Sequence, residues 1–432
     1  MKSFQKGGTI YQINLRMFTT QGTLAAAEEL LPHIAELGVE FVYLCPVAEA
    51  DPDTRREFWS ERQKTYGAEN PRNPYRIRDY FKIDPEYGTD ASLRSFVGKA
   101  HGLGLRVLLD LVYFHCGPTA SLIDLVPEVF QKDENGVPVP GGWHFPRIDF
   151  RSAKLREYLW SNMEYFVREF NVDGYRVDVG DMTPLDFWEE GRRRIQAIDP
   201  DVFMLSEAEG KAEYFNSAFD CAYGFRGIHG LANLIRHCEN KELGIDAKAY
   251  AEIIAGSLRE VGPGHVLRGF SNHDISTDHR FLDWADERAK ETAFVLCFTL
   301  DGYPFLYNGQ EIADRNKHNM FYPAGHGWGV DWSRAFTKDG IRRMDLIRRF
   351  TALRKQYPEL YDGSYRLISA DESTIRFIRA DHLMITVSFS GSPVELAVNE
   401  KVKEEIFQSG GVETAEGTLR LPPFGWIIQE IC

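Results

Sequence analysis

The sequence predicts an α/β protein: a (β/α)8 TIM barrel with a short insert after its third strand, followed by a small antiparallel β-domain. Eight short apolar runs between residues 9 and 309 mostly alternate with amphipathic helical segments. Polar residues stand at the C-terminal ends of several runs, where such barrels build their sites. After about residue 360, short strands alternate with turns rich in Gly, Ser and Asp.

The eight runs are rich in Val, Ile, Leu and Phe without polar alternation, which is typical of parallel strands covered on both faces. They lie at residues 9–15, 39–44, 106–112, 174–179, 202–207, 219–225, 265–274 and 303–309. A doubly wound open sheet is the structural alternative, but no run is followed by a GxGxxG turn. Gly102 and Gly104, before the third run, are instead typical of a helix C-cap and turn.

We predict a barrel over residues 1–360 and a β-sandwich-like domain over residues 361–432. Two connections in the barrel are long, residues 46–78 and residues 113–149. The second of these is the short insert after the third strand. Long structured loops at the C-terminal ends of barrel strands are expected to form the walls of a site.

The composition favours a small uncharged or cationic partner. Asp and Glu number 64 against 50 Lys and Arg, and the net charge of −14 disfavours nucleic acid and anionic membranes. The six cysteines have no CxxC spacing, which argues against zinc or a redox pair, and Cys45, Cys221 and Cys297 are expected to be buried thiols. With no apolar run of membrane-spanning length, we expect a cytoplasmic protein; a secreted one without its signal stays open.

Several polar side chains end different runs and should face one site. They are Asp110, His115, Arg176, Asp178, Glu207, His273 and Asp274. Each alone is compatible with an ordinary turn, cap or hydrogen-bonded role. Several acids on neighbouring strand ends repel one another, however, and this repulsion destabilises the fold. Such a cluster of acids is usually kept only at a functional site.

This set of groups suits the cleavage of a glycosidic bond. One carboxylate attacks the anomeric carbon, and a second, kept protonated, donates to the leaving oxygen. Arg176 and Asp178 lie two residues apart on one strand and share a face, so we expect Arg176 to lower the pKa of Asp178. Two nearby acids compete for these roles: Asp181, which we expect to cap the next helix, and Glu209.

Four motifs occur in the order found in the α-amylase superfamily of retaining glycoside hydrolases, glycoside hydrolase family 13, which the sequence resembles over nearly its whole length. They are DLVYFH (110–115), GYRVD (174–178), LSEAE (205–209) and FSNHD (270–274). The segment NPYRIRDYFKIDPEYGT (73–89) resembles the one in which a tyrosine, here Tyr75, stacks on the sugar at the cleavage point.

The resemblance implies roles for these residues. Asp178 would be the nucleophile, Glu207 the general acid and base, and Asp274 the stabiliser of the transition state. The residues expected to hold the sugar are Arg176, His273, His115, Tyr75 and Asp110. The implied activity is α-amylase-like hydrolysis of α-1,4-glucans or maltodextrins. An α-glucosidase, including an α-1,6 type, or a glucanotransferase is the alternative.

The chain departs from the family at Phe114, where an asparagine usually supplies an oxygen ligand to a structural calcium. Because a phenyl ring cannot ligate a hard cation, we predict no calcium, no other metal and no cofactor. A non-catalytic barrel should lack at least one of the three carboxylates, and all three are present. The expected partner is an oligo- or polysaccharide of α-linked glucose; the oligomeric state stays open.

Overall fold

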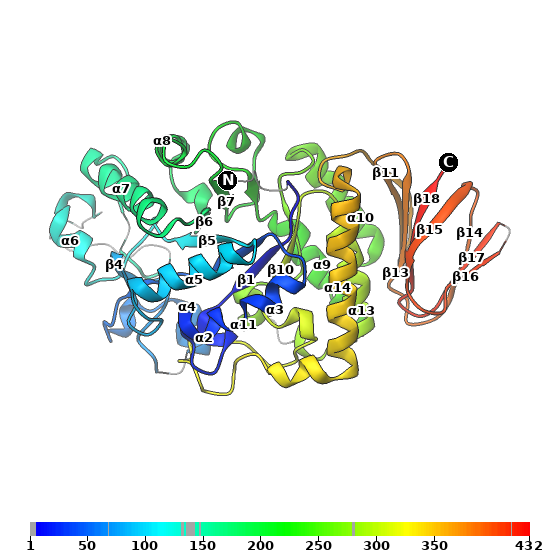
Figure 1. Cartoon of the computed structure of the whole chain (residues 1–432), viewed down its shortest axis with the longest axis horizontal. Helices are drawn as coiled ribbons and strands as arrows, with labels where there is room; N and C mark the ends of the chain where they lie inside the picture. The colour runs from blue at the N-terminus through cyan, green and yellow to red at the C-terminus, as the bar shows by residue number, and fades with distance from the viewer. Residues whose placement is uncertain are drawn as a thin grey trace.

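The computed structural model describes residues 6–67, 69–130, 134, 143–146, 148–278, 281–415 and 417–432. Its larger part is a parallel sheet of eight strands surrounded by helices (Figure 1). The strands are β1 (Ile10–Ile13), β2 (Phe41–Leu44), β5 (Arg106–Leu111), β6 (Gly174–Val177), β7 (Phe203–Ser206), β8 (Cys221–Ala222), β9 (Leu267–Arg268) and β10 (Tyr303–Tyr307). Each strand lies inside one of the eight predicted runs, so the prediction of these strands is confirmed.

The sheet closes on itself. Its strand order is β8-β7-β6-β5-β2-β1-β10-β9, and a parallel bridge between Ala222 and Val266 joins the two ends of that order. Most of these strand residues are fully buried, as expected for apolar runs with side chains on one face filling the barrel and on the other packing under helices. The closed order excludes the doubly wound alternative.

The main helices cover the outside of the barrel. They are α5 (Asp90–Gly102), α7 (Ala153–Phe170), α8 (Leu185–Gln196), α9 (Phe225–Glu239), α10 (Ala247–Glu260), α13 (Glu287–Thr299) and α14 (Lys338–Gln356). Local hydrogen bonds and turns determine where α5 begins and ends. Thr89 and Ser92 form a capping box at its start. Gly104 follows that helix with φ of 79°, in line with the predicted turn.

The connections hold shorter elements. Those of the barrel are α1 (Leu15–Phe18), α2 (Leu24–Glu28), α3 (Leu31–Glu36), β3 (Ala48–Ala50), η1 (Arg56–Phe58), α4 (Glu61–Tyr66), β4 (Ile77–Ile83), α6 (Ser121–Leu125), η2 (Pro127–Val129), η3 (Gly180–Met182), η4 (Ala212–Phe215), α11 (His273–Asp278), α12 (Phe281–Trp284), η5 (Gln310–Ile312), η6 (Trp332–Phe336) and η7 (Pro358–Leu360). Much of the predicted insert, from residue 131 to residue 142, lies outside the described residues apart from residue 134.

The C-terminal part forms two antiparallel sheets, ordered β11-β12-β13-β18-β15 and β14-β17-β16. The strands are β11 (Tyr365–Ala370), β12 (Thr374–Arg379), β13 (Leu383–Ser388), β14 (Val394–Ala397), β15 (Val402–Gln408), β16 (Glu413–Ala415), β17 (Thr418–Leu421) and β18 (Trp426–Ile431). Helix α14 stands between them and the barrel, and its Phe350 ring lies 5.1 Å from Phe407 and 5.6 Å from Trp426. The core therefore continues from the barrel into the C-terminal sheets.

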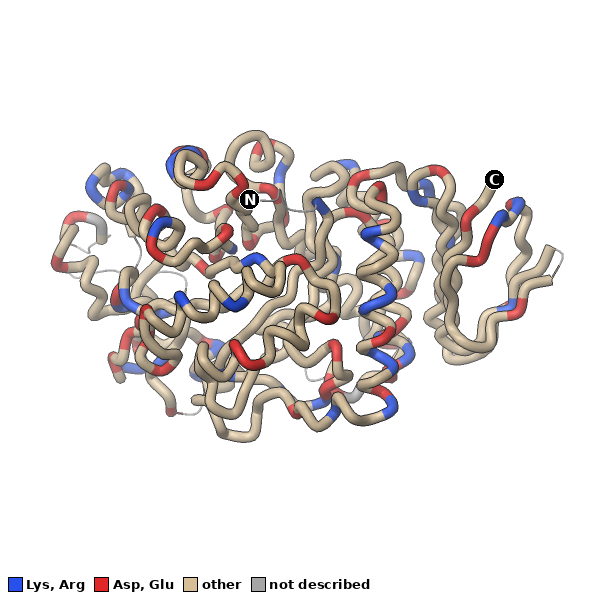
Figure 2. The backbone as a smooth tube through the Cα atoms, viewed as in Figure 1, with Lys and Arg blue, Asp and Glu red and all other residues tan. Residues whose placement is uncertain are grey.

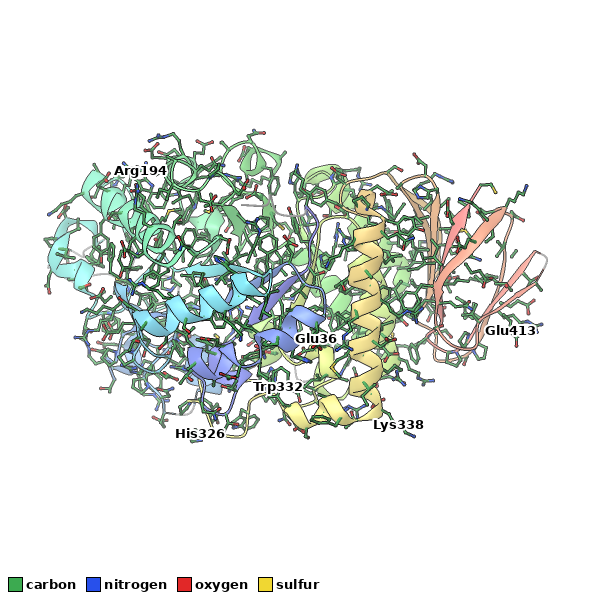
Figure 3. The ribbon with its side chains drawn as sticks, viewed as in Figure 1. Glu36, Arg194, His326, Trp332, Lys338 and Glu413 are labelled. Carbon is green, nitrogen blue, oxygen red and sulfur yellow. The ribbon has the colours of Figure 1, made fainter. Side chains whose placement is uncertain are left out.

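The surface mixes both charges. Figure 2 shows Lys and Arg spaced along α14 with Asp and Glu spread over neighbouring segments. Figure 3 shows Arg194 of α8 and Glu413 of the three-stranded sheet at opposite ends of the elongated molecule. All six cysteines are free, and the predicted burial of Cys45, Cys221 and Cys297 is confirmed. Within the described residues, the apolar stretches of the helices all fall short of what a membrane crossing requires.

Gly174 fixes the approach of β6 to β7. Its φ is +148°, and a Cβ added there would lie 1.9 Å from the Phe203 carbonyl oxygen. We expect Gly174→Ala to destabilise the fold by about 3 kcal/mol through overpacking and backbone strain. Gly98→Ala in α5 meets nothing within 4 Å and should stabilise by about 0.5–1 kcal/mol. Urea unfolding midpoints measure both; an unchanged midpoint for Gly174→Ala would contradict the packing argument.

Candidate active site

The polar groups predicted at the strand ends meet around one cavity of about 370 Å³. Six of the eight predicted site residues line it: Tyr75, His115, Asp178, Glu207, His273 and Asp274. The other two, Asp110 and Arg176, lie beneath this wall with side chains that are 0% exposed. The structure thus brings all eight residues together from the ends of β5, β6 and β7, from the start of α11 and from the loop before β4.

Arg176 is the charged centre of the site. Its Nη1 donates to Asp110 Oδ1 at 2.6 Å and to Asp178 Oδ1 at 3.0 Å. Its Nη2 lies 2.8 Å from Glu207 Oε2. Because the guanidinium is a rigid planar fork, it fixes carboxylates from three adjacent strands in relation to one another.

Asp110 lies beneath the cavity wall and holds three of its neighbours by hydrogen bonds. Its Oδ2 accepts hydrogen bonds from the Tyr43 hydroxyl at 2.6 Å and the Tyr75 hydroxyl at 2.9 Å, while its other oxygen holds Arg176. The Tyr75 ring in turn stacks on the His273 ring, with centroids 5.2 Å apart and an interplanar angle of 8°. Asp110 therefore positions Arg176 and the tyrosine that lines the cavity.

Asp178 and Glu207 are two buried acids that raise each other's proton affinity. Burial raises the pKa of Asp178 well above the ordinary aspartate value, and the charge of Glu207 raises it further. Burial also raises the pKa of Glu207. Arg176 lowers both, but burial outweighs it, so the expectation of a lowered pKa for Asp178 is wrong. The pair retains a proton in a pH range where two separate carboxyls would both be ionised.

A strained turn orients Glu207. Val179 has φ of 40° and ψ of 50°, a left-handed conformation that β-branched residues rarely adopt. In this conformation its backbone N–H donates to Glu207 Oε2 at 2.9 Å. Such strain costs of order 1–3 kcal/mol and persists where the surroundings impose it, often at functional sites. No local pattern of residues predicts this contact.

The two histidines are neutral hydrogen-bonding groups. Burial lowers the pKa of His115 and of His273, in each case to about 4. Gln12 Nε2 donates to His273 Nδ1 at 2.8 Å, which leaves the proton of His273 on Nε2. His115 Nε2 donates to the Tyr75 carbonyl at 2.8 Å, and its Nδ1 has no hydrogen-bond partner within the described part of the chain.

Asp274 has a partner that sequence reasoning missed. Arg62 of α4 donates from Nη1 to Asp274 Oδ1 at 2.7 Å and holds Asp278 through its other two nitrogens at 3.0 and 2.9 Å. Burial works to raise the pKa of Asp274, but the neighbouring His273 ring and the charge of Arg62 lower it below the ordinary value. Of the three carboxylates, Asp274 is therefore the one whose pKa lies below the ordinary value, which favours its ionised form.

The two competing acids lie away from the cavity wall. Asp181 is exposed in η3 and does not cap the next helix, because Pro184 occupies the N-cap of α8 without a side-chain hydrogen bond. The expectation of a cap is therefore wrong. Glu209 accepts from the Arg226 side chain at 2.7 Å and from its backbone N–H at 3.0 Å, which commits it to an ion pair.

The residue expected to replace a calcium ligand is packed among rings. The Phe114 ring lies 5.6 Å from the Trp143 ring in an edge-to-face arrangement, and His115 lies 4.7 Å from Phe145. An aromatic ring offers no oxygen, so this position does not fit a calcium ion. Across the described residues, no group of three His, Cys, Asp or Glu side chains could hold a metal ion.

Comparisons with known proteins agree with this geometry. The family described as alpha amylase, catalytic domain, matches residues 2–132 and 143–356. A cyclomaltodextrinase from a Bacillus species is 24% identical over 389 residues, which cover 83% of this chain but only 64% of that relative. Two solved structures share the fold over 99% of both chains: a maltogenic alpha-amylase from Thermotoga neapolitana (TM-score 0.79, 22% identity) and an alpha-amylase from Lactobacillus plantarum (TM-score 0.77, 24% identity).

Proposed function

Because the chain belongs to the alpha-amylase family, we propose that it is a retaining glycoside hydrolase that cleaves the α-1,4-glucosidic bonds of maltodextrins. The observation that carries the proposal is the set of three carboxylates, Asp178, Glu207 and Asp274, on one cavity of about 370 Å³. The relatives named cyclomaltodextrinase and maltogenic alpha-amylase support the substrate class. A relative named intracellular maltogenic amylase, from Bacillus subtilis, supports a proposed location inside the cell.

In the first step, Asp178 attacks the anomeric carbon of the bound glucose and Glu207 gives its proton to the departing glycosidic oxygen. The C–O bond to the leaving sugar breaks, and a covalent glycosyl ester with Asp178 forms. Asp274, ionised beside Arg62, grips sugar hydroxyls and favours the positively charged transition state. His115 and His273, both neutral, would hydrogen-bond the same sugar, and their position on the cavity wall supports this role.

In the second step, Glu207 takes a proton from water, and the hydroxyl replaces Asp178 at the anomeric carbon. Two inversions leave the configuration retained. A retaining mechanism requires the carboxyls of Asp178 and Glu207 to lie so close together that no water molecule fits between the nucleophile and the sugar. The contacts of Asp178 and Glu207 with adjacent nitrogens of Arg176 support this arrangement.

The test is the anomeric configuration of the first product. Maltoheptaose is digested by the wild-type enzyme in an NMR tube, and the new reducing-end signals are followed before they equilibrate. We expect the α signal first and the β signal only as mutarotation proceeds. A β signal appearing first would overturn retention. Equal inactivity of the wild type and Asp178→Ala on a panel of α-glucosides would overturn the enzymatic function.

A further inference from the structure

The helix α4 forms one wall of the cavity. Ser60, Glu61 and Arg62, at the start of this helix, line it together with the three carboxylates. The Ser60 side chain accepts from the Gln63 backbone N–H at 3.1 Å and so fixes the first turn of α4. This wall of the cavity is therefore formed by a capped helix and not by an irregular loop.

Contacts on both flanks hold α4 over the cavity. On one flank, His144 Nε2 from the insert lies 2.9 Å from Glu61 Oε1. On the other, Asn319 Nδ2 donates to the Tyr66 carbonyl at 2.8 Å, and Asn70 Nδ2 donates to the Phe321 carbonyl at 2.9 Å. The insert, α4 and the loop after β10 are thus joined along one side of the cavity.

Arg62 anchors the middle of this wall to the site. It spans Asp274 and Asp278 with three hydrogen bonds, and its side chain remains 38% exposed. In the proposed mechanism Asp274 grips the sugar whose anomeric carbon is attacked, whereas Glu207 faces the leaving group. Arg62, bound to Asp274, therefore lies beside the attacked sugar.

The cavity is small for a site that acts on a polysaccharide chain. Its volume of about 370 Å³ is near the lower limit of the roughly 300–1,000 Å³ typical of small-molecule pockets. A chain that continued past the attacked sugar would have to displace a guanidinium held by two carboxylates. Displacing Arg62 would break three hydrogen bonds to carboxylates, which makes it an obstacle rather than a flexible rim residue.

We infer that α4, with Arg62 at its centre, closes the glycone end of the cavity, so that the enzyme removes short units from the non-reducing ends of α-glucans and does not cut within the chain. This inference rests on the proposed function and specifies its substrate class further. Arg62 is the residue that determines this specificity. Three of the five donors of its guanidinium bind Asp274 and Asp278, and the other two match the hydroxyls of a terminal sugar.

The test compares two heptaosides. One is p-nitrophenyl α-maltoheptaoside with a free non-reducing end, and the other carries a 4,6-ethylidene group on that end. Loss of the intact heptaoside is followed by chromatography. We expect the kcat/KM of the wild type to be at least about tenfold lower for the blocked substrate than for the free one, which is the scale of a modest steric rejection. Equal use of both would overturn the closed end and leave the proposed hydrolase intact, whereas no loss of either would overturn the hydrolase itself.

Variants assign the effect to Arg62. Arg62→Ala should raise the ratio of blocked to free kcat/KM towards one, while a purely structural role would lower both values and leave the ratio unchanged. Arg56→Ala is the matched control, because Arg56 lies in the same loop, 56% exposed and paired with Glu69 at 2.9 Å. It should keep the wild-type ratio. If Arg62→Ala does not fold, Arg62→Gln removes the charge with less loss of packing, and a wild-type ratio in a folded variant would overturn the assignment.

Discussion

Replacing Asp178 by asparagine is expected to lower kcat on maltoheptaose by roughly 10⁴- to 10⁶-fold, the scale of losing a residue on which a covalent mechanism depends. Asparagine keeps the shape of the side chain and an oxygen that can accept from Arg176. Its amide oxygen is a poor nucleophile and carries no charge to oppose the developing positive charge. The loss should therefore appear in kcat, measured by reducing-end release, with the cavity intact.

The control for this variant is Asp181→Asn, three residues away in the same stretch. Asp181 is exposed, and we expect its replacement to leave kcat within a factor of about two, as for a surface substitution away from the cavity. If both variants lost activity alike, the assignment of Asp178 would fail. If Asp178→Asn kept wild-type kcat, another group would have to be the nucleophile.

Stability gives Asp178→Asn a second readout. The pKa of Asp178 is higher in the folded protein than in the unfolded chain. Its ionisation therefore destabilises the fold as the pH rises from the unfolded-state pKa to the folded-state pKa, and the full destabilisation remains at every higher pH. Asparagine does not ionise, so the cost disappears. The unfolding midpoint of Asp178→Asn should therefore exceed that of the wild type at neutral pH and approach it in acid. A lower midpoint at neutral pH would contradict the raised pKa.

The barrel was readable from the sequence because its strands must be apolar on both faces. Runs such as 106–112 and 174–179 carry few polar residues until their ends, and the polar residues that appear there are forced to one face of the barrel. That geometric rule is enough to bring Asp110, Asp178 and Glu207 together. It needs no knowledge of the loops.

The rest of the site depends on loops and on burial, which no local pattern encodes. Arg62 is one of several charged residues between 53 and 64, and only the folded connection places it on Asp274. The left-handed Val179 follows from the turn that the barrel imposes and not from its own preference. Asp178 was expected to have a lowered pKa because its arginine was visible in the sequence, whereas the depth of its burial was not.

Replacing Glu207 by glutamine is expected to reduce kcat on maltoheptaose by about 10²- to 10⁴-fold, the usual contribution of general acid catalysis. The glutamine can still accept the Val179 N–H, so the turn should be preserved. α-Maltosyl fluoride, whose leaving group needs little protonation, should restore most of the first step. Glu209→Gln, which removes a carboxylate paired with Arg226, should leave both substrates unaffected.

The pH dependence then separates an acid catalyst from a structural carboxylate. Glu207 must be protonated in the free enzyme, and burial raises its pKa above the ordinary value of 4.5, although Arg176 lowers it. Wild-type kcat/KM should therefore persist to a pH above 4.5 and fall as Glu207 loses its proton. With α-maltosyl fluoride, Glu207→Gln should lose this alkaline limb, because glutamine has no proton to lose there. An alkaline limb that survived unchanged in Glu207→Gln would belong to another group and would remove Glu207 from the acid role.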